Sequence, residues 1–80
     1  MIMIDVLVPP LYEVYDFEVD ESMEGQSLID GIENLISKKY NIRFASFERE
    51  LFDYSQAVFI QKKETLKSQN VVNGTRLIMI

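Results

Sequence analysis

The fold of this chain is decided by residues 65–80, TLKSQNVVNGTRLIMI. Asn73-Gly74 is a strong turn signal, and the pair divides a mostly polar stretch from an apolar one. Residues 75–80 are apolar apart from Thr75 and Arg76, which predicts a final strand. A strand as apolar as this one suits the centre of a sheet, where a neighbour flanks it on each side.

The other end of the chain predicts a hairpin. Residues 2–8 (IMIDVLV) alternate around Asp5, and Pro9-Pro10 ends the strand because proline donates no ladder hydrogen bond. Residues 12–20 (YEVYDFEVD) alternate again, with aromatic and apolar residues on one face and carboxylates on the other. In the first strand, the side chains expected to point into the core are Ile2, Ile4, Val6 and Val8. In the second strand, Tyr15, Phe17 and Val19 share one face, and Asp16, Glu18 and Asp20 share the other.

Residues 28–39 change to a helical period. Ser27 is placed as an N-cap, and Asp30 three residues later resembles the second half of a capping box. Gly31 lies off the pattern; a close approach of helix to sheet and a tolerated imperfection are equally good explanations. The expected core stripe of this helix is Leu28, Ile29, Ile32, Leu35 and Ile36.

The region after the helix is read as a loop followed by two short strands. Ile42, Phe44 and Phe47 are expected to fill the core from a loop or a short helical turn. Strands are predicted at residues 49–53 and 57–61. The complete order is β-β-α-β-β-β, an α+β fold in which one helix packs on one face of a mixed sheet. With only 80 residues, one domain spanning 1–80 is expected.

Composition argues against catalysis and against metal or cofactor chemistry. The chain has no Cys and no His, which excludes thiolate metal sites and the usual general base and Ser-His pairing. The run of five carboxylates over residues 16–24 invites a calcium site, but apolar residues alternate with them, and a solvated strand face is the better interpretation. We therefore expect no catalytic, metal or cofactor-binding residues and no cofactor.

The charge distribution favours a protein partner over a nucleic acid. Thirteen acidic and eight basic residues give a net charge of −5, whereas phosphate binding needs a positive field. Residues 1–37 hold nine carboxylates and no basic residue (−9), and residues 38–80 hold eight basic and four acidic residues (+4). The apolar start contains Asp5 and runs into Pro9-Pro10, which is too short for a signal peptide or a membrane span. A cytoplasmic chain without direct membrane insertion is expected.

The order of elements and several short motifs resemble ubiquitin and the β-grasp fold. The residues that carry the resemblance are Thr65 to Val71 before the final turn, Phe17-Glu18-Val19 in the second strand and Leu51-Phe52 in the third. Ubiquitin-type modifiers and sulfur carriers extend past the last strand into a tail that ends in Gly-Gly. Here the sequence ends at Ile80, inside the expected strand, so a non-conjugating protein is expected.

Among ubiquitin-like proteins, the chain is most similar to the YukD-like (EsaB-like) family of bacterial type VII secretion systems. Leu66-Lys67-Ser68 and the segment Val72 to Ile80 carry this similarity, with Thr75 where Asp is common. The resemblance implies a cytosolic accessory of WXG-type substrate export without a catalytic role. Two alternatives stay open: a modifier or sulfur-carrier relative acting through its C-terminus, and an interaction domain of another bacterial complex.

Strand parity predicts a protein-binding patch on the face of the sheet away from the helix. If the inward residues are assigned correctly, the outward apolar residues are Met3, Leu7, Phe52, Ile78 and Ile80. In ubiquitin the corresponding surface is recognised by partners. Components of the type VII secretion machinery are the partners that the resemblance implies, and a homodimer through this face is the other association considered.

Overall fold

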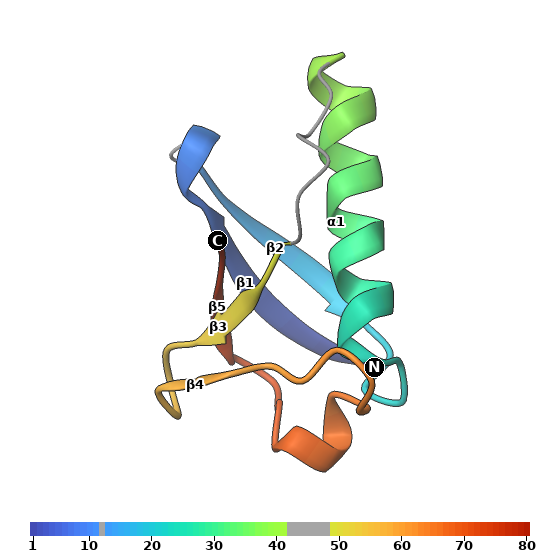
Figure 1. Ribbon diagram of the computed structural model, residues 1–80, viewed down its shortest axis with the longest axis vertical. Coiled ribbons are helices and arrows are strands. Elements are labelled where there is room, and N and C mark those ends of the chain that lie inside the picture. The colour runs from blue at the N-terminus through green and yellow to red at the C-terminus, as the bar shows by residue number, and fades with distance from the viewer. Residues whose placement is uncertain (12, 42–48) are drawn as a thin grey trace.

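The computed structural model describes residues 1–11, 13–41 and 49–80, and it has the predicted β-β-α-β-β-β order (Figure 1). The predictions for Ile42, Phe44 and Phe47 lie outside these ranges. Two short 3-10 turns, Pro9–Leu11 and Lys67–Gln69, join the larger elements. The helix and strands are β1 (Ile2–Val8), β2 (Glu13–Val19), α1 (Gly25–Tyr40), β3 (Leu51–Asp53), β4 (Val58–Phe59) and β5 (Arg76–Met79).

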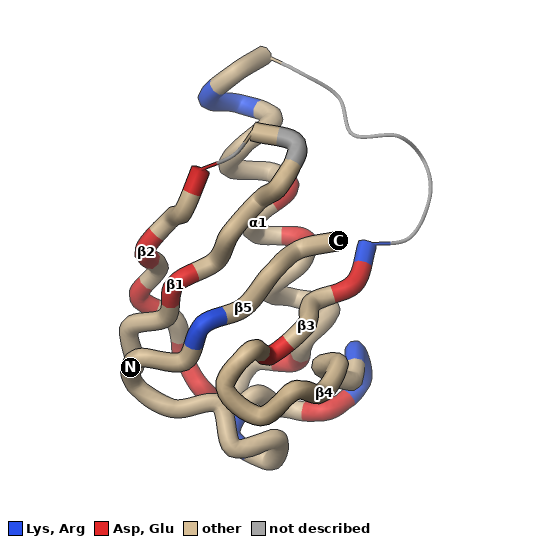
Figure 2. The backbone as a smooth tube through the Cα atoms, turned by 90° about the vertical axis from the view of Figure 1, so that its left-hand side faces the viewer, with Lys and Arg blue, Asp and Glu red and all other residues tan. Residues whose placement is uncertain are grey.

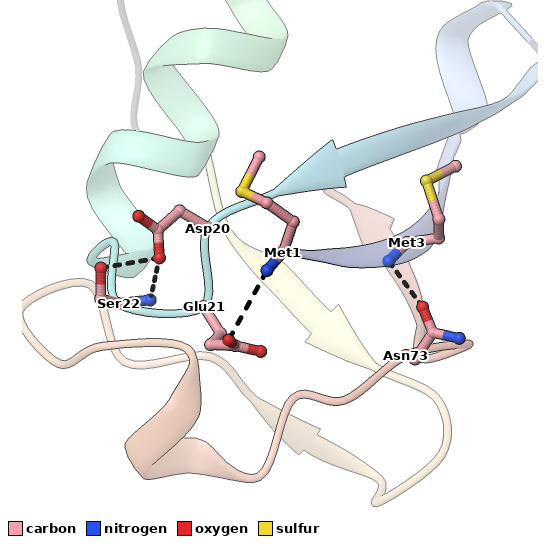
Figure 3. A network of polar contacts seen from close by, with 6 residues as sticks. All are labelled: Met1, Met3, Asp20, Glu21, Ser22 and Asn73. Atoms are coloured by element: carbon pink, nitrogen blue, oxygen red, sulfur yellow. Dashed lines mark hydrogen bonds and ion pairs between the residues drawn. The ribbon is translucent and has the colours of Figure 1, made fainter.

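The five strands form one mixed sheet in the order β2-β1-β5-β3-β4, so the central position predicted for the last strand is confirmed. β5 runs parallel to β1 and antiparallel to β3. The turn before β5 is joined directly to β1. Met3 N–H donates to Asn73 Oδ1 over 2.8 Å (Figure 3), and Gly74 N–H donates to the Met3 carbonyl over 2.8 Å. Gly74 has a φ of +89°, a conformation that only glycine adopts without strain.

The core lies between α1 and one face of the sheet. Alternation along β1 buries Ile2, Ile4, Val6 and Val8, as predicted. Leu66 is also completely buried, although it lies in the irregular segment before β5. The remaining buried apolar residues are Val19, Leu28, Ile29, Ile32, Ile36, Leu51, Ile60, Val71, Leu77 and Met79.

The helix begins at Gly25, three residues before the predicted start, and Ser27 is not its N-cap. Glu24 takes the N-cap position and makes no side-chain capping bond. The first helical N–H groups are instead satisfied by backbone carbonyls from a distant loop: Gly25 N–H donates to Glu64 O over 3.1 Å, and Gln26 N–H to Lys62 O over 2.9 Å. This tertiary solution replaces the side-chain cap that the local sequence predicts.

The close approach between the helix and the rest of the fold occurs at Gly25 rather than at Gly31. A Cβ added at Gly25 would lie 2.7 Å from Gln61 O and 2.9 Å from Ile60 Cγ2, so a side chain there would force the backbone to move. A Cβ at Gly31 would meet no atom within 4 Å. Of the two explanations for Gly31, the structure contradicts the close approach to the sheet.

Leu35 was predicted to be in the core, but its side chain is 48% exposed. The helix directs Leu28, Ile32 and Ile36 at the sheet, and Leu35 lies at the edge of that stripe. The strand predictions were also too long. Ala57 has a left-handed φ of +58°, which ends the turn between β3 and β4 and excludes Ala57 from the strand.

A buried carboxylate organises the turn between β3 and β4. Asp53 is fully buried, and its Oδ1 accepts hydrogen bonds from Ser55 N–H over 2.8 Å and Gln56 N–H over 3.2 Å. Its Oδ2 accepts a hydrogen bond from Gln56 Nε2 over 2.8 Å. The same Gln56 amide donates to the Gln69 carbonyl, so the turn is attached to the segment that leads to β5. These bonds offset the cost of burying the carboxylate.

The turn between β2 and α1 is held by two acidic residues (Figure 3). Asp20 Oδ1 accepts hydrogen bonds from Ser22 N–H over 2.9 Å and Ser22 Oγ over 2.7 Å. The backbone N–H of Ser22 is the main reason why the pKa of Asp20 lies below its ordinary value. Glu21 lies 3.8 Å from the N-terminal ammonium of Met1. Among the described residues, no helix has both the length and the apolar character needed to cross a membrane.

A cluster of two phenols and one carboxylate joins the start of β2 to the end of α1. The hydroxyls of Tyr15 and Tyr40 donate to Glu13 Oε2 over 2.6 and 2.7 Å, and the two hydroxyl oxygens are 3.0 Å apart. The Lys39 ammonium lies 5.2 Å from the centre of the Tyr15 ring. The hydrogen bond to Glu13 strongly raises the pKa of Tyr15, and the bond from Tyr15 lowers the pKa of Glu13.

Replacing Ile32 by alanine tests the position of the helix. Ile32 is 1% exposed, so Ile32→Ala should lower the free energy of unfolding by about 2–5 kcal/mol, as large-to-small changes in cores do. Leu35→Ala, one turn along on the exposed side, should change it by less than about 0.5 kcal/mol. Chemical denaturation measures both values. A loss below about 0.5 kcal/mol for Ile32→Ala would show that the helix presents another face.

Replacing Glu13 by glutamine tests the phenol cluster. A raised Tyr15 pKa adds stability that is present below the ordinary pKa of 10.0 and is lost as the pH rises through the raised value. Glu13→Gln removes the charged acceptor, so the Tyr15 pKa should fall towards its ordinary value. The part of the tyrosine absorbance change that occurs at the high-pH end of a titration should then move to lower pH than in the unsubstituted protein. Glu18→Gln, the same charge change on the same strand, is the control and should leave the titration unchanged; an unchanged titration in Glu13→Gln would contradict the cluster.

Candidate interaction surface

The face of the sheet opposite α1 carries a continuous row of apolar side chains. The pairing register joins Leu7 to Val14 on one side and to Ile78 on the other. It then joins Ile78 to Phe52, and Phe52 to Phe59. Paired residues on adjacent strands project from the same face, so these five side chains form one line across all five strands. We call Val14, Leu7, Ile78, Phe52 and Phe59 the apolar row.

The two ends of the apolar row are more exposed than its middle. Val14 is 62% exposed and Phe59 is 51% exposed, whereas Leu7, Phe52 and Ile78 are half-buried by their neighbours. The Phe52 ring meets the Phe59 ring edge to face, with centroids 5.1 Å apart and an interplanar angle of 71°. It meets the Tyr54 ring at 6.1 Å and 79°. Such edge-to-face pairs stabilise the arrangement of the rings.

A second row, which we call the charged row, lies beside the apolar row on the same face, two residues away along each strand. Its members are Asp16 on β2, Asp5 on β1 and Arg76 on β5. Asp5 pairs with Asp16 on β2 and with Arg76 on β5, and the Asp5 Oδ2 to Arg76 Nε distance is 4.0 Å. The hydrogen bond between the two carboxyl groups, followed by their repulsion, raises the pKa of Asp16. A hollow of about 330 Å³ is lined by residues of both rows, including Val14, Leu7 and Arg76, together with Tyr54.

The structure brings together only part of the predicted patch. Leu7, Phe52 and Ile78 lie side by side in the apolar row. Ile80 continues the line of Ile78 along the chain, and its backbone exchanges two hydrogen bonds with Glu50, of 2.8 and 3.1 Å. Met3 lies apart: it pairs with Glu18, and Asp5 separates it from Leu7 along β1, a distance of about 13 Å at the usual strand rise.

Two members of the apolar row were not predicted. Along β2, Val14 lies on the same face of the strand as Asp16 and Glu18, and Tyr15 lies on the other face. Alternation along β2 therefore indicates that Val14 points outward. Phe59 belongs to a strand of only two residues in which both side chains are exposed, so alternation does not assign its face. Its place is set by the pairing of Phe59 with Phe52, which is a tertiary feature.

The apolar row and the charged row together form one continuous surface on this face. When an apolar centre is flanked by charges, a binding surface loses water from the apolar centre, and the charges fix its orientation. The carboxylates of Asp16 and Glu18 are exposed, as predicted for a solvated strand face. Among the described residues, no three acidic side chains gather in a group that could hold a metal ion.

Comparison with solved structures identifies the fold as a ubiquitin-like β-grasp. The chain superimposes with a TM-score of 0.75 on the ubiquitin-like domain of an Arabidopsis thaliana protein, at 15% identity over 99% of this chain and 74% of that one. It matches a designed protein based on ubiquitin with a TM-score of 0.67, at 10% identity over 99% of this chain and 85% of the other. It also matches ATBAG1, solved in complex with HSP70, with a TM-score of 0.67 and 10% identity. That match covers 100% of this chain and 40% of ATBAG1.

No protein-family model and no curated protein sequence matches the chain. At these identities the structural matches establish the fold. They confirm the ubiquitin-like β-grasp prediction and its single helix on a mixed five-stranded sheet.

Replacing Asp16 by asparagine tests the carboxylate pair. A raised pKa means that the contribution of Asp16 to stability is present below its ordinary pKa of 3.8 and is lost as the pH rises through the raised value. Asp16→Asn should therefore melt at a higher temperature than the unsubstituted protein near pH 7, and the difference should shrink towards pH 3. Thermal melts over this pH range measure the difference. A lower melting temperature for Asp16→Asn near pH 7 would contradict the repulsion.

Proposed function

We propose that this protein is a non-catalytic binding module that engages a protein partner through the apolar row. The observation that carries the proposal is the continuity of the row across all five strands, on the face that α1 leaves uncovered. The adjacent charged row of Asp16, Asp5 and Arg76 gives the surface an orientation. Its support from the comparisons is the fold alone, which is widely used for protein binding.

The more specific proposal is a YukD-like cytoplasmic accessory of a bacterial type VII secretion system. Its support is the sequence similarity at Leu66-Lys67-Ser68 and over Val72 to Ile80. The partners would then be WXG-type substrates or the FtsK/SpoIIIE-like ATPase of the same system. Genes for these proteins beside the gene for this chain would support the assignment.

Two substitutions in the apolar row test the binding surface. Phe52→Ala and Ile78→Ser remove the two central apolar contacts of the row, so each should weaken partner binding at least tenfold, as the loss of a central contact does. Titration of the purified chain with the ATPase's cytosolic domain and with the WXG-type substrates measures the affinity. Val72→Ser is the matched control, because Val72 is an exposed apolar residue outside the row.

Each outcome of this test has a definite meaning. Circular dichroism and amide spectra of the variants should match those of the unsubstituted protein; unfolding of both variants would show that the residues belong to the core. Absence of binding to any component of the secretion system would overturn the type VII assignment. A C-terminal adenylate or thioester formed with ATP and an E1-like enzyme would instead place the chain among modifiers or sulfur carriers.

A further inference from the structure

A second apolar surface lies on the other side of the sheet, between α1 and β2. It is a groove of about 340 Å³. Leu35, whose helical neighbours Ile32 and Ile36 are buried, leaves 48% of its surface exposed here. Gly31 widens the groove, because it has no side chain and nothing lies within 4 Å of the position that a Cβ would take. The apolar residues that line the groove are Phe17, Val19, Met23, Leu28, Ile32 and Leu35.

The groove runs beside a free edge of the sheet. In the part of the chain that the structure describes, β2 pairs with β1 and with no other strand, and Figure 1 shows it beside α1. Asp5 N–H bonds to Thr75 O, so the peptide groups of odd-numbered residues in β1 face β5, and those of even-numbered residues face β2. Phe17 pairs with Ile4, and Tyr15 pairs with Val6, so the N–H and C=O groups of Phe17 and Tyr15 face β1. The N–H and C=O groups of the alternate residues, Asp16 and Glu18 among them, therefore point away from the sheet.

This edge is acidic. Asp16 and Glu18 carry exposed side chains on the face opposite the groove, and residues 1–37 contain no basic residue at all. Figure 2 shows the acidic positions along β1 and β2, with basic positions at the end of α1 and at the start of β5. One of these basic residues, Lys38, lines the groove together with the polar residues Ser27 and Asn34. A strand added beside β2 would therefore place one set of its side chains next to carboxylates and the alternate set over the apolar groove.

We propose that β2 and the groove bind an extended peptide segment of alternating basic and apolar residues, which joins the sheet as an additional edge strand. Backbone hydrogen bonds to the free edge of β2 would supply affinity, and the two sets of side chains would supply specificity. A second copy of this chain does not fit the site. Pairing of β2 with another β2 sets carboxylates beside carboxylates, which opposes self-association.

The probe is a blocked synthetic peptide, Lys-Val-Lys-Ile-Lys-Val-Lys, added to the isotopically labelled full chain. The expected result is a set of amide shift changes over residues 13–19 and on the Leu35 side of α1, with slower hydrogen exchange at Asp16 and Glu18. A peptide of the same charge with Ser in place of Val and Ile should bind at least tenfold more weakly. Equal affinity for the two peptides would overturn the proposal, because charge alone would then explain binding.

Charge reversal tests the orientation of the added strand. The double variant Asp16→Lys with Glu18→Lys should lose affinity for the lysine peptide by at least tenfold and should prefer the corresponding glutamate peptide. Glu33→Lys, a single reversal on the helix outside the groove lining, is the control and should change affinity far less. An unchanged preference in the double variant would contradict the placement of basic side chains beside β2.

Filling the groove tests the apolar half of the site. Gly31→Leu places a side chain in the open space and replaces glycine by a better helix former, so it should abolish peptide binding without loss of stability. Gly31→Ala adds only a Cβ and should retain binding. Ile78→Ser, in the apolar row, should leave peptide binding unchanged, which separates this proposal from the proposed function. Shift changes confined to the apolar row, or full binding by Gly31→Leu, would overturn it.

Discussion

The pairing of β5 with β1 is the interaction on which the rest of this structure depends. It brings the last residues of the chain beside the first ones, in parallel, and it is secured where Gly74 and Asn73 bond to the backbone of Met3. Once β5 lies next to β1, its other edge is open to β3, and the sheet acquires two faces with different neighbours. The alternation of Leu77 and Ile78 then gives one side chain to the core and the next to the opposite surface.

The helix packs on one of those faces, and this packing leaves two kinds of exposed surface. Its N-terminus is held by carbonyls of Lys62 and Glu64, and the close approach at Gly25 sets where it begins. On the face that the helix leaves uncovered, the apolar row spans the sheet. Along the edge where the helix overlies β2, a groove remains because Gly31 and the exposed Leu35 do not close it. The two surfaces differ in position: one is a row of side chains across a face of the sheet, and the other is a groove beside an open strand edge.

The same carboxylates border both surfaces. The strands β1 and β2 hold the carboxylates Asp5, Asp16 and Glu18, and Arg76 Nε lies 4.0 Å from Asp5 Oδ2. The unneutralised carboxylates at the free edge of β2 discourage pairing with another copy. The same charges make that edge receptive to a basic segment. The charge split between the two parts of the sequence thus becomes a difference between regions of one small domain.

Alternation and helical period in the sequence indicated the strands, the helix and most of the core, because these patterns depend on neighbours close along the chain. The apolar composition of β5 indicated its central place in the sheet. Alternation also placed Leu7, Phe52 and Ile78 on the outer face, and the parity of Val14 was readable in β2. The tertiary structure alone decided the start of the helix, since its N–H groups find carbonyls almost forty residues away. It also decided the entry of Phe59 into the row, through the pairing of Phe59 with Phe52. Register between strands sets which outward side chains become neighbours, and register is not written in the period of any single segment.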